Sequence, residues 1–510
     1  MNWTRKWKLA TELHFPLGIY IRGRKRERLA SLLVICVKKL QAEQFEAMED
    51  ERQLLLKVTE ELQNLADASL QNVLWDRRSI YKIPASVTAQ NETAYMPQTV
   101  SFGPYHYDES HLKPMEEHKQ RALTYYLKRA GKPLQAVVQS LNGEIQVLRD
   151  SYDMLDGSWK DDKKKFLQLM ILDGCFMLEI IRLATVHSSL DDYAANDPVF
   201  SSHGRLYVAP YIRRDMLLLE NQLPMLVLYK LASLEREPQG EEAVSMLVLN
   251  FCYPNKSVSK MDKCLHVLDL YRKSLLPEDP ARKMRRPGVK SGLQNDENDI
   301  VRSATELNEA GIQFKKARTK SLRDISFRGG VLELPVIVVD DATKATFLNL
   351  IAFERLHVDS GKEVTSYVSF MQTLIANERD VALLHLRGII QNAIGSDTAV
   401  CELFNSLPKD MAMEPNSSLE AVQMQVNAYS QKPWNEWRAN LVHTYFRNPW
   451  AILALIAVLI FFALACARTV YSIIPYYDPI QVTSLLPPMG SGARPPPRRP
   501  PTRTSNFPPY

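Results

Sequence analysis

The sequence has 510 residues, of which 24% are charged and 45% hydrophobic. This composition is ordinary for a globular protein, so it excludes collagen-like and wholly disordered chains and allows one large core or several smaller ones. The net charge of +5 is concentrated at the ends, because residues 1–40 carry an excess of eight positive charges and residues 477–510 an excess of three. By subtraction the body sums to about −6. Net charge therefore disfavours nucleic-acid binding, including binding through the basic stretch 5–28.

Cysteine usage indicates a reducing compartment. The six cysteines lie far apart and none forms a C-x-x-C pair. Most lie in apolar surroundings, where a thiol packs as a small hydrophobic group. We therefore expect no disulfide framework and no zinc site. These cysteines are Cys36, Cys175, Cys252, Cys264, Cys401 and Cys466.

Residues 1–74 are predicted to be a basic extension followed by an amphipathic helix. The apolar run Leu29–Val37 has only nine residues and ends in two lysines, so we expect no cleavable signal peptide. From Phe45 to Leu74, leucines and valines recur at steps of three and four residues with no Gly or Pro, which is typical of a helix. A start at Met48 is the alternative, in which case residues 1–47 are absent from the mature protein.

Residues 75–276 are predicted to form the helical N-terminal part of the body. Phe166–Ala184 has a wide apolar face at helical spacing. Met216–Leu234 is apolar except for Glu220-Asn221-Gln222, and Pro224 should end or kink a helix there. Because buried polar side chains must be paired, these three residues are expected to hold the helix break by bonding free backbone groups.

Residues 277–308 are polar, with scattered Gly and Pro, and are predicted to be a flexible surface excursion. Residues 309–433 then combine helices with a small sheet. Ile325–Arg328 and Val331–Leu334 flank two glycines, as in a short hairpin, and Pro335 confines the next strand to an edge.

A further helix follows this predicted strand. Asp340-Asp341 should cap the helix, which carries Phe347, Leu350, Ile351 and Leu356. The predicted fold class is mainly α: a helical globular body with a small β-hairpin or sheet and one C-terminal transmembrane helix.

The transmembrane prediction rests on Trp450–Ala467, which follows a juxtamembrane segment over 434–449. These eighteen residues contain no charge, and ten of them are Ile, Leu, Val or Phe. They would span roughly 27 Å as a helix, with an insertion free energy of about −3 to −6 kcal/mol. The alternative is a helix buried in a large core, but such a helix seldom lacks a polar face over five turns.

The orientation prediction places the body in the cytosol. Lys432, Arg438 and Arg447 precede the span closely, whereas Arg468 alone follows it closely, which favours the body on the cytosolic side. The basic tail further out favours the opposite orientation. N-x-S/T triplets begin at Asn2, Asn91, Asn255 and Asn416 and would be glycosylation candidates if the body were lumenal.

Residues 477–510 contain ten of the thirty prolines and are predicted to be a disordered, extended tail. Arg494–Pro500 has the R-x-x-P-x-x-P pattern that SH3-like domains bind, because polyproline II presents those prolines on one ridge. A spacer with an accidental match is the alternative. Cys466, at the membrane edge, is a candidate for palmitoylation or a thiol without a role.

A search for catalytic motifs finds no phosphate-binding loop, dinucleotide fingerprint, nucleophile elbow or zinc-protease motif. The richest polar cluster is the Tyr105-His106-Tyr107 loop. It is followed by His111 and then by His118, which lies within a predicted helix that begins near Pro114. These histidines could ligate a metal if the loop folded back. The alternative is a rigid turn at Gly103-Pro104 with His106 bonded to backbone. We assign no catalytic, cofactor-binding or metal-binding residue.

Several sequence blocks, in order, resemble the plant domain-of-unknown-function family 247 (DUF247), also called UPF0481. They cover roughly residues 75–474. The blocks are Ile83-Pro84 with Tyr95–His106 and Leu112–Lys119; Leu172–Glu179; Asp215–Pro224; Ala304–Leu307 with Ala310–Ile312; Asn349–Glu354 with Thr365–Tyr367; and Trp434–Ile474.

The resemblance implies a mostly helical protein that ends in one membrane span, without an established enzymatic activity, cofactor or set of functional residues. Some grass members are associated with pollen–stigma self-incompatibility, so by analogy it also implies recognition or signalling. We expect a non-enzymatic, single-pass plant protein, with the plasma membrane favoured. It would contact lipid through Trp450–Ala467 and bind an unidentified protein. The alternative is an unrecognised enzyme or metal-binding protein that uses the Tyr105-His106-Tyr107 loop.

Overall fold

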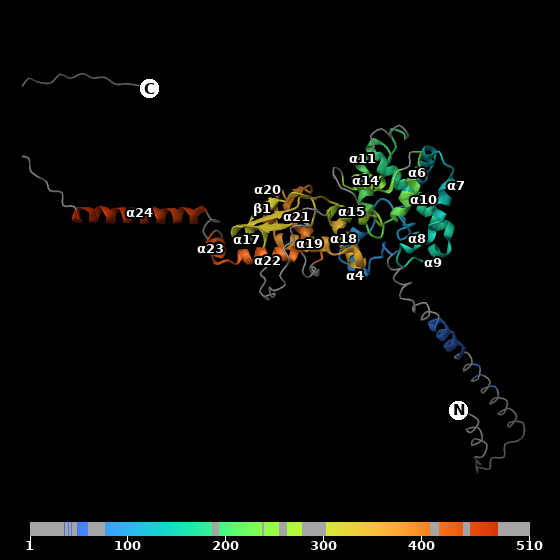
Figure 1. Ribbon diagram of the computed structural model, residues 1–510, viewed down its shortest axis with the longest axis horizontal. Helices are drawn as coiled ribbons and strands as arrows, with labels where there is room; N and C mark the ends of the chain where they lie inside the picture. Colours follow the sequence, from blue (N-terminus) through green and yellow to red (C-terminus); the bar gives the residue numbers. More distant parts are fainter. Residues whose placement is uncertain are drawn as a thin grey trace, which may run out of the picture. The chain divides into compact units, whose positions relative to one another are not determined.

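The computed structural model describes residues 35, 39, 42, 48–59, 77–185, 193–236, 239–253, 263–277, 302–408, 418–441 and 449–477. Over these ranges the chain is mainly α-helical and carries two small β-sheets (Figure 1). A long apolar helix lies towards the C-terminus. The predicted fold class is therefore confirmed.

The helices that precede the first strand are α4 (Ala85–Thr88), α5 (Glu92–Tyr95), α6 (Pro114–Ala130), α7 (Leu134–Asn142), α8 (Ile145–Asp150), α9 (Gly157–Asp161), α10 (Lys163–Thr185), α11 (Ser202–Tyr207), α12 (Ala209–Asp215), α13 (Met225–Ala232), α14 (Glu241–Cys252), α15 (Val267–Leu275) and α17 (Ala304–Glu309). The later elements are β1 (Gln313–Lys316), β2 (Ser326–Arg328), β3 (Val331–Leu334), β4 (Ile337–Val339), α18 (Thr343–Leu356), η2 (Val358–Ser360), α19 (Glu363–Leu374), α20 (Glu378–Leu386), β5 (Ile390–Asn392), α21 (Asp397–Asn405), α22 (Ser418–Ser430), α23 (Pro433–Leu441) and α24 (Pro449–Tyr477).

Helix α6 shows why these segments begin and end where they do. Pro114 occupies the first turn, where its missing amide costs no hydrogen bond, and Glu116 and Glu117 face the positive end of the helix dipole. Gly131 ends the helix in the left-handed conformation, with φ 63°, and donates its amide to the carbonyl of Leu127. The predicted start near Pro114 is confirmed.

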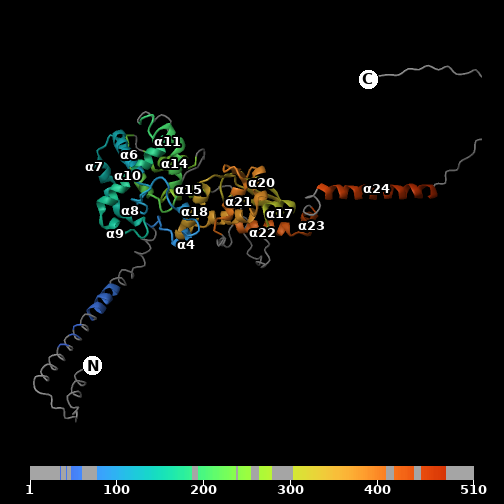
Figure 2. The same cartoon turned by 180° about the vertical axis from the view of Figure 1, so that it is seen from behind.

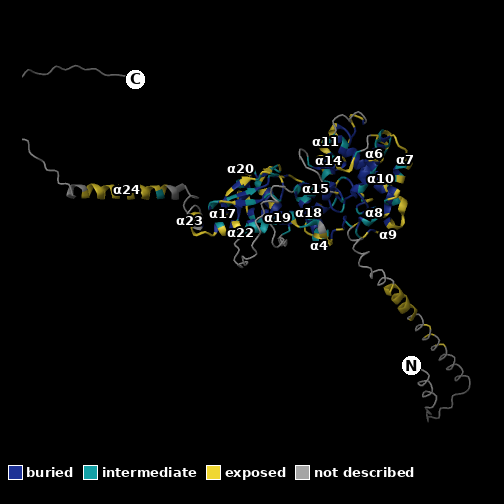
Figure 3. Ribbon diagram, viewed as in Figure 1, coloured by how far each residue is buried: buried dark blue, intermediate teal, exposed yellow. Residues whose placement is uncertain are grey.

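Helix α10 is the centre of the N-terminal core. It is buried along almost its whole length (Figure 3) and packs against α6, α7, α9, α13 and α14. Its neighbours α6 and α7 lie beside it in both opposite views (Figure 2). At Gly174 an added Cβ would come within 2.6 Å of Leu231 and 2.7 Å of Val227 on α13. The glycine therefore permits the close approach of the two helices. The predicted helix Phe166–Ala184 is confirmed.

The first sheet contains the predicted hairpin. Strands β2 and β3 pair antiparallel around Gly329 and Gly330, which have φ values of 57° and 83°. Strand β1 adds to β3 in parallel, so the order is β1-β3-β2. The second sheet pairs β4 in parallel with β5. Both of its strands are edges, as expected after Pro335.

Helix α18 begins after the acidic pair Asp340-Asp341, but its N-cap residue is Ala342 and no side chain makes a cap hydrogen bond, so the predicted capping by the acidic pair is wrong. The Oδ1 of Asp340 accepts hydrogen bonds from the amide of Ala342, at 3.2 Å, and from the hydroxyl of Thr343, at 2.7 Å. Phe347, Leu350 and Ile351 are buried, as the apolar spacing indicated, and the helix continues to Leu356.

Other predicted elements differ in extent. Residues 48–59 are helical, and the rest of the predicted helix Phe45–Leu74 lies outside the described residues. Most of the predicted excursion 277–308 also lies outside them, although α17 forms within its last residues. The segment 216–224 is not helical, because Pro224 precedes the first turn of α13 and residues 216–223 form turns.

The chain divides into two compact units. One comprises Met1–Thr305 and Gln313–Asn427, and the other comprises Glu306–Ile312 and Ala428–Tyr510. The candidate site described next lies within the first unit, and the apolar helix α24 lies within the second.

Candidate functional site

The most unusual feature of the first unit is a buried segment, Met96–His106, that has no regular secondary structure. Most of its residues between Val100 and His106 are buried. A buried backbone without a helix or strand partner leaves its amides and carbonyls to be satisfied in another way. Polar side chains from surrounding helices and from the loop 216–224 supply these partners.

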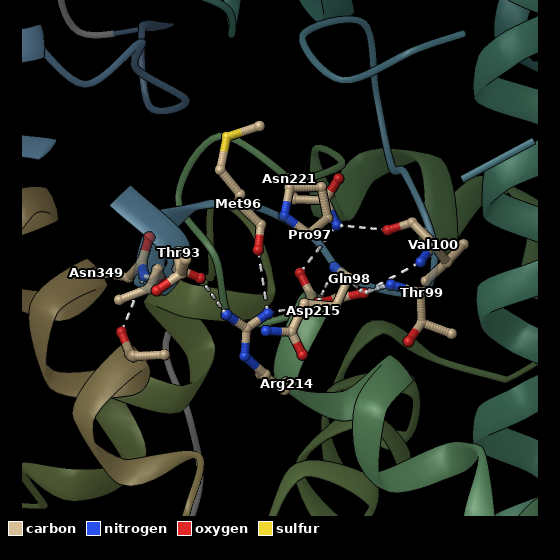
Figure 4. A network of polar contacts seen from close by, with 12 residues as sticks. Thr93, Met96, Pro97, Gln98, Thr99, Val100, Arg214, Asp215, Asn221 and Asn349 are labelled. Carbon is tan, nitrogen blue, oxygen red and sulfur yellow. Dashed lines mark hydrogen bonds and ion pairs between the residues drawn. The ribbon is translucent and has the colours of Figure 1, made fainter. Parts of the chain in front are cut away.

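Asp215, the last residue of α12, binds the start of the buried segment. Its carboxylate accepts hydrogen bonds from three consecutive amides, those of Gln98 at 3.1 Å, Thr99 at 2.7 Å and Val100 at 3.0 Å (Figure 4). Arg214 completes the group with an Nη1–Oδ1 distance of 2.8 Å. Burial raises the pKa of Asp215, although the amides and Arg214 act in the opposite direction.

Asn221 binds the middle of the buried segment on both sides of its backbone. Its Oδ1 accepts the amide of Phe102 at 2.7 Å, and its Nδ2 donates to the carbonyl of Val100 at 3.0 Å. The same Nδ2 donates to the carbonyl of Asp215 at 3.0 Å. The side-chain amide therefore takes the place of a neighbouring strand.

Gln222 holds the break between α12 and α13. Its Nε2 donates to the carbonyls of Met216 at 2.6 Å and Leu218 at 2.7 Å, which no helix satisfies. Its Oε1 accepts the amide of Leu268 at 3.0 Å. Together with Asn221, this confirms the expectation that polar residues in this apolar run bond free backbone groups.

Lys119 and Asp173 form a fully buried ion pair beneath the segment. Both side chains have no exposed surface, and the Nζ–Oδ1 distance is 2.7 Å. Lys119 Nζ also lies 2.6 Å from Glu116 and donates to the carbonyl of Ser101 at 2.7 Å. Asp173 accepts the amide of Gly103 at 2.8 Å. We call Lys119, Asp173, Asp215, Asn221 and Gln222 the buried polar network.

The electrostatic attraction between Lys119 and Asp173 favours the charged form of both groups and opposes the effect of burial. Burial raises the pKa of Asp173 to about 6, against the lowering influence of Lys119. Burial lowers the pKa of Lys119, but the charges of Asp173 and Glu116 outweigh it and the pKa stays above its ordinary value. Because every group is hydrogen-bonded to backbone or to its partner, the pair serves to hold the chain in place.

The Tyr105-His106-Tyr107 loop is engaged by protein groups. His106 is 4% exposed; its Nδ1 lies 2.7 Å from Glu109 and its Nε2 3.4 Å from Glu220. The prediction that His106 bonds to backbone is therefore wrong, because Glu109 faces one ring nitrogen and Glu220 faces the other. Burial lowers the pKa of His106, but the hydrogen bonds to Glu220 and Glu109 outweigh it and raise the pKa above 6.5.

The neighbours of His106 are held in place as well. The hydroxyl of Tyr105 donates to the carbonyls of Ile80 and Asp153, and burial raises the pKa of this phenol. The ring of Tyr107 packs edge-on against Trp159, with centroids 5.1 Å apart. The expected turn at Gly103 is present, with φ 71°.

Two of the three histidines of the predicted cluster meet at one carboxylate, because His106 Nδ1 lies 2.7 Å and His111 Nδ1 3.7 Å from Glu109. His111 Nε2 lies 3.0 Å from the carbonyl of Pro97, and His118 lies on α6. Across the described part of the chain, no group of three or more His, Cys, Asp or Glu side chains could hold a metal ion.

Sequence reasoning missed other buried groups that join distant segments. Asn349 on α18 accepts the amide of Leu219 at 2.8 Å and donates to the carbonyl of Ala94 at 3.1 Å. Glu354 pairs with Arg272 at 2.7 Å and accepts the amide of Thr365 at 2.8 Å. The sequence signal that could have identified Asn349 and Glu354 was a polar side chain within an apolar helical run.

The remaining candidate features are exposed. Leu206, Tyr207 and Tyr211 on α11 and α12 are 65%, 63% and 55% exposed, and we call them the α11–α12 patch. In the second unit, the described side chains of α24 are almost all exposed (Figure 3). Its window Leu453–Ile473 has a mean hydropathy of 2.5 with no part buried, so it could cross a membrane by length and composition.

Helix α24 is longer than the predicted span. It runs from Pro449 to Tyr477, ten residues past the predicted end at Ala467. The hydroxyls of Thr469 and Ser472 donate to the carbonyls of Ala465 at 2.9 Å and Arg468 at 2.8 Å. These bonds satisfy the polar groups of the last turns within the helix, as a bilayer requires.

Comparisons with known proteins relate most of the chain to plant proteins. The chain is 32% identical over 424 residues to the UPF0481 protein At3g47200 of Arabidopsis thaliana, covering 78% of this chain and 87% of the relative. It is 21% identical over 483 residues to a second UPF0481 protein of that plant, At3g02645, covering 74% and 87%. No solved structure matches the chain. The model of the family DUF247, described as plant protein of unknown function, matches residues 80–464, and the chain belongs to this family.

Proposed function

We propose that this protein is a single-pass membrane protein of the plant plasma membrane whose cytosolic body binds another protein and has no enzymatic activity. Helix α24 carries this proposal, because it is long, apolar and exposed over Leu453–Ile473. A soluble protein seldom leaves such a surface in water. A bilayer covers it without the cost of exposing apolar side chains.

The dimensions of α24 fit a bilayer. Its 21-residue window spans about 31 Å as a helix, close to the hydrocarbon thickness of about 30 Å. Eleven of these residues are Leu, Ile, Val or Phe, which favours insertion by about 3–7 kcal/mol. Arg468 lies near one end, where its long side chain can reach the headgroups.

Charge supports a cytosolic body. Arg438 and Arg447 lie within 20 residues before the window Leu453–Ile473, and no Lys or Arg lies within 20 residues after it. Positive residues near a span favour the cytosolic side.

Two observations support recognition over catalysis. The side chains of Tyr105 and His106 bond to protein groups, which leaves them fixed instead of presented to a substrate. The α11–α12 patch instead exposes two tyrosines and a leucine within six residues. Tyrosine is enriched at protein interfaces because it combines apolar area with a hydroxyl. We assign the contact with a protein partner to this patch.

Extraction from membranes tests the anchor. The full chain should stay in the membrane fraction after carbonate washing, and Leu459→Arg/Phe462→Arg should release it, since two central charges oppose insertion. Leu386→Arg is the matched control, because Leu386 is exposed on the body and should leave extraction unchanged. Release of the unmodified chain by carbonate would contradict the proposal.

Site-specific photo-crosslinking in plant membranes tests recognition. A photoreactive amino acid at Tyr207 or Tyr211 should form an adduct with a discrete protein. The same group at Val358, which is 95% exposed, should not. Equal adducts at all three positions, or none at any of them, would count against the α11–α12 patch. A partner that joins through the tail would instead require the Arg494–Pro500 segment, which lies outside the described residues.

A further inference from the structure

Helix α23, in the second unit, has two different faces. On one face Asn435 is buried, and its Nδ2 donates to the carbonyl of Tyr429 at 2.8 Å. Three residues later, Arg438 lies beside Gly311, where an added Cβ would come within 2.8 Å of the guanidinium. Asn435 and Arg438 lie three residues apart, so their contacts hold one side of α23 against its own unit. Arg438 is also four residues after Trp434 and therefore lies at the border with the side that carries the tryptophans.

The other face exposes two tryptophans. Trp434 is 71% exposed and Trp437 57%, although tryptophan is a residue that proteins usually cover. Their ring centroids lie 5.4 Å apart with an interplanar angle of 34°, so the indoles form one continuous aromatic surface.

The position of α23 in the chain indicates what covers this surface. Helix α23 ends at Leu441 and α24 begins at Pro449, so seven residues separate them. Seven residues reach at most about 25 Å. If α24 crosses the bilayer, α23 is held within reach of the headgroup layer. Indoles are enriched at that depth, because the ring is apolar while its N–H binds polar groups.

Nearby charges favour the same location. Lys432 and Arg438 flank the two tryptophans, and both are exposed. Basic residues next to a span are attracted to anionic lipids of the cytosolic leaflet. A helix with aromatic residues on one side and basic residues beside them is typical of binding to a membrane surface.

We propose that α23 lies on the cytosolic membrane surface, with Trp434 and Trp437 inserted at the boundary between headgroups and acyl chains. This inference rests on the proposed anchoring by α24 and extends it, because it attaches the second unit to the membrane at a second point. An embedded α23 fixes one side of its own unit against the lipid.

Fluorescence quenching by brominated lipids tests the proposal. The full chain is reconstituted into vesicles of phosphatidylcholine and phosphatidylserine that carry bromine either near the glycerol backbone or at the chain ends. Emission lost in Trp434→Phe/Trp437→Phe, relative to the unmodified chain, reports on the two indoles. Trp450→Phe reports separately on the start of the span, and Trp159→Phe, at a position 5% exposed in the body, is the control.

We expect the emission of Trp434 and Trp437 to be quenched by the shallow bromines and poorly by aqueous acrylamide, with this lipid quenching lost in the double variant. The Trp159 emission should respond to neither. If Trp450 is quenched by lipid while Trp434 and Trp437 respond only to acrylamide, the inference is wrong and the anchor stands. Protection of the pair from both quenchers overturns it in favour of a protein contact. If Trp450 also escapes lipid quenching, both proposals fail.

Discussion

Asp215 illustrates how single side chains determine the structure of this protein. One carboxylate accepts three consecutive amides of a segment that has no strand partner. Asn221 and Asp173 do the same for the amides of Phe102 and Gly103. In a sheet these bonds would come from another backbone, and any neighbouring sequence could supply them. Here the path of the chain depends on particular residue types at particular positions.

Lys119 is the residue in the network whose loss should be most damaging. Lys119→Met removes the only cation that contacts Asp173 among the ion pairs of the described residues, and leaves a buried carboxylate unpaired. We expect a loss of about 3–5 kcal/mol in the free energy of unfolding. Urea unfolding of the full chain in detergent, followed by circular dichroism, measures it.

Two further variants test the reason for this loss. Lys128→Met, at an exposed position of the same helix, should change stability little. Lys119→Met/Asp173→Asn should be less destabilised than Lys119→Met, because the unpaired charge is gone. Equal losses in the single and double variants would show that the charge is not the cause.

His106 should make stability depend on pH. Because its folded pKa lies above 6.5, the stabilisation from its carboxylate partners is complete below pH 6.5 and is lost as the pH rises through the higher folded value. The difference in unfolding free energy between the unmodified chain and His106→Gln should therefore be larger at about pH 6 than at about pH 9. Glu109→Gln should weaken this dependence, and an identical difference at both pH values would refute it.

At the residue scale, local sequence allowed part of the site to be predicted. The role of Gln222 in holding the helix break followed from polar residues in an apolar run. Glu109, three residues after His106, was within local reach and was missed. The contact of His106 with Glu220 could not be predicted locally, because Glu220 lies more than a hundred residues further along the chain. Glu220 could be recognised as a polar residue in an apolar run, but its contact with His106 depends on how the helices pack.

At the element scale, segments with strong local signals were predicted and short nonlocal ones were not. Helix α10 and the β2–β3 hairpin have clear periodicity and a two-glycine turn. Strands β1 and β5 have four and three residues and pair in parallel with strands that are distant in sequence. Such pairs carry no turn signal, and three or four residues are too few to show alternation.

Gly103 should be required for the turn of the buried segment. It has φ 71°, and an added Cβ would lie 2.8 Å from the carbonyl oxygen of Gln222 and 2.9 Å from the hydroxyl of Tyr152. We expect Gly103→Ala to lower the free energy of unfolding by about 2–5 kcal/mol through backbone strain and overpacking. Gly143→Ala is the control, since no atom lies within 4 Å of its added Cβ.

The measurement is thermal or urea unfolding of both glycine variants. Gly143→Ala should change stability by less than about 1 kcal/mol, because its backbone conformation suits alanine. Similar stabilities for the two variants would mean that the buried segment can move away from Gln222, and that the network is less rigid than its contacts indicate.

At the scale of the whole molecule, the proposed topology places the body and the tail on opposite sides of the membrane. The triplets at Asn91, Asn255 and Asn416 would then never meet the glycosylation machinery. Arg503→Asn creates a new triplet with Thr504 and Ser505 beyond the span. We expect a glycosidase-sensitive gain in mass for this variant alone. Glycosylation of the body in the unmodified chain would show that the protein has the opposite orientation in the membrane.

The long reach of Asn349 has a consequence for how the protein is made. Its side chain bonds the backbone near residues 94 and 219, so those early segments cannot complete their packing until the ribosome has added residue 349. The first unit ends at Asn427 and helix α24 begins 22 residues later, which at a synthesis rate of about 5–20 residues per second is roughly 1–4 s. The whole first unit is therefore synthesised before the apolar segment leaves the ribosome, and a unit that has folded by then is too bulky to pass through a translocation channel.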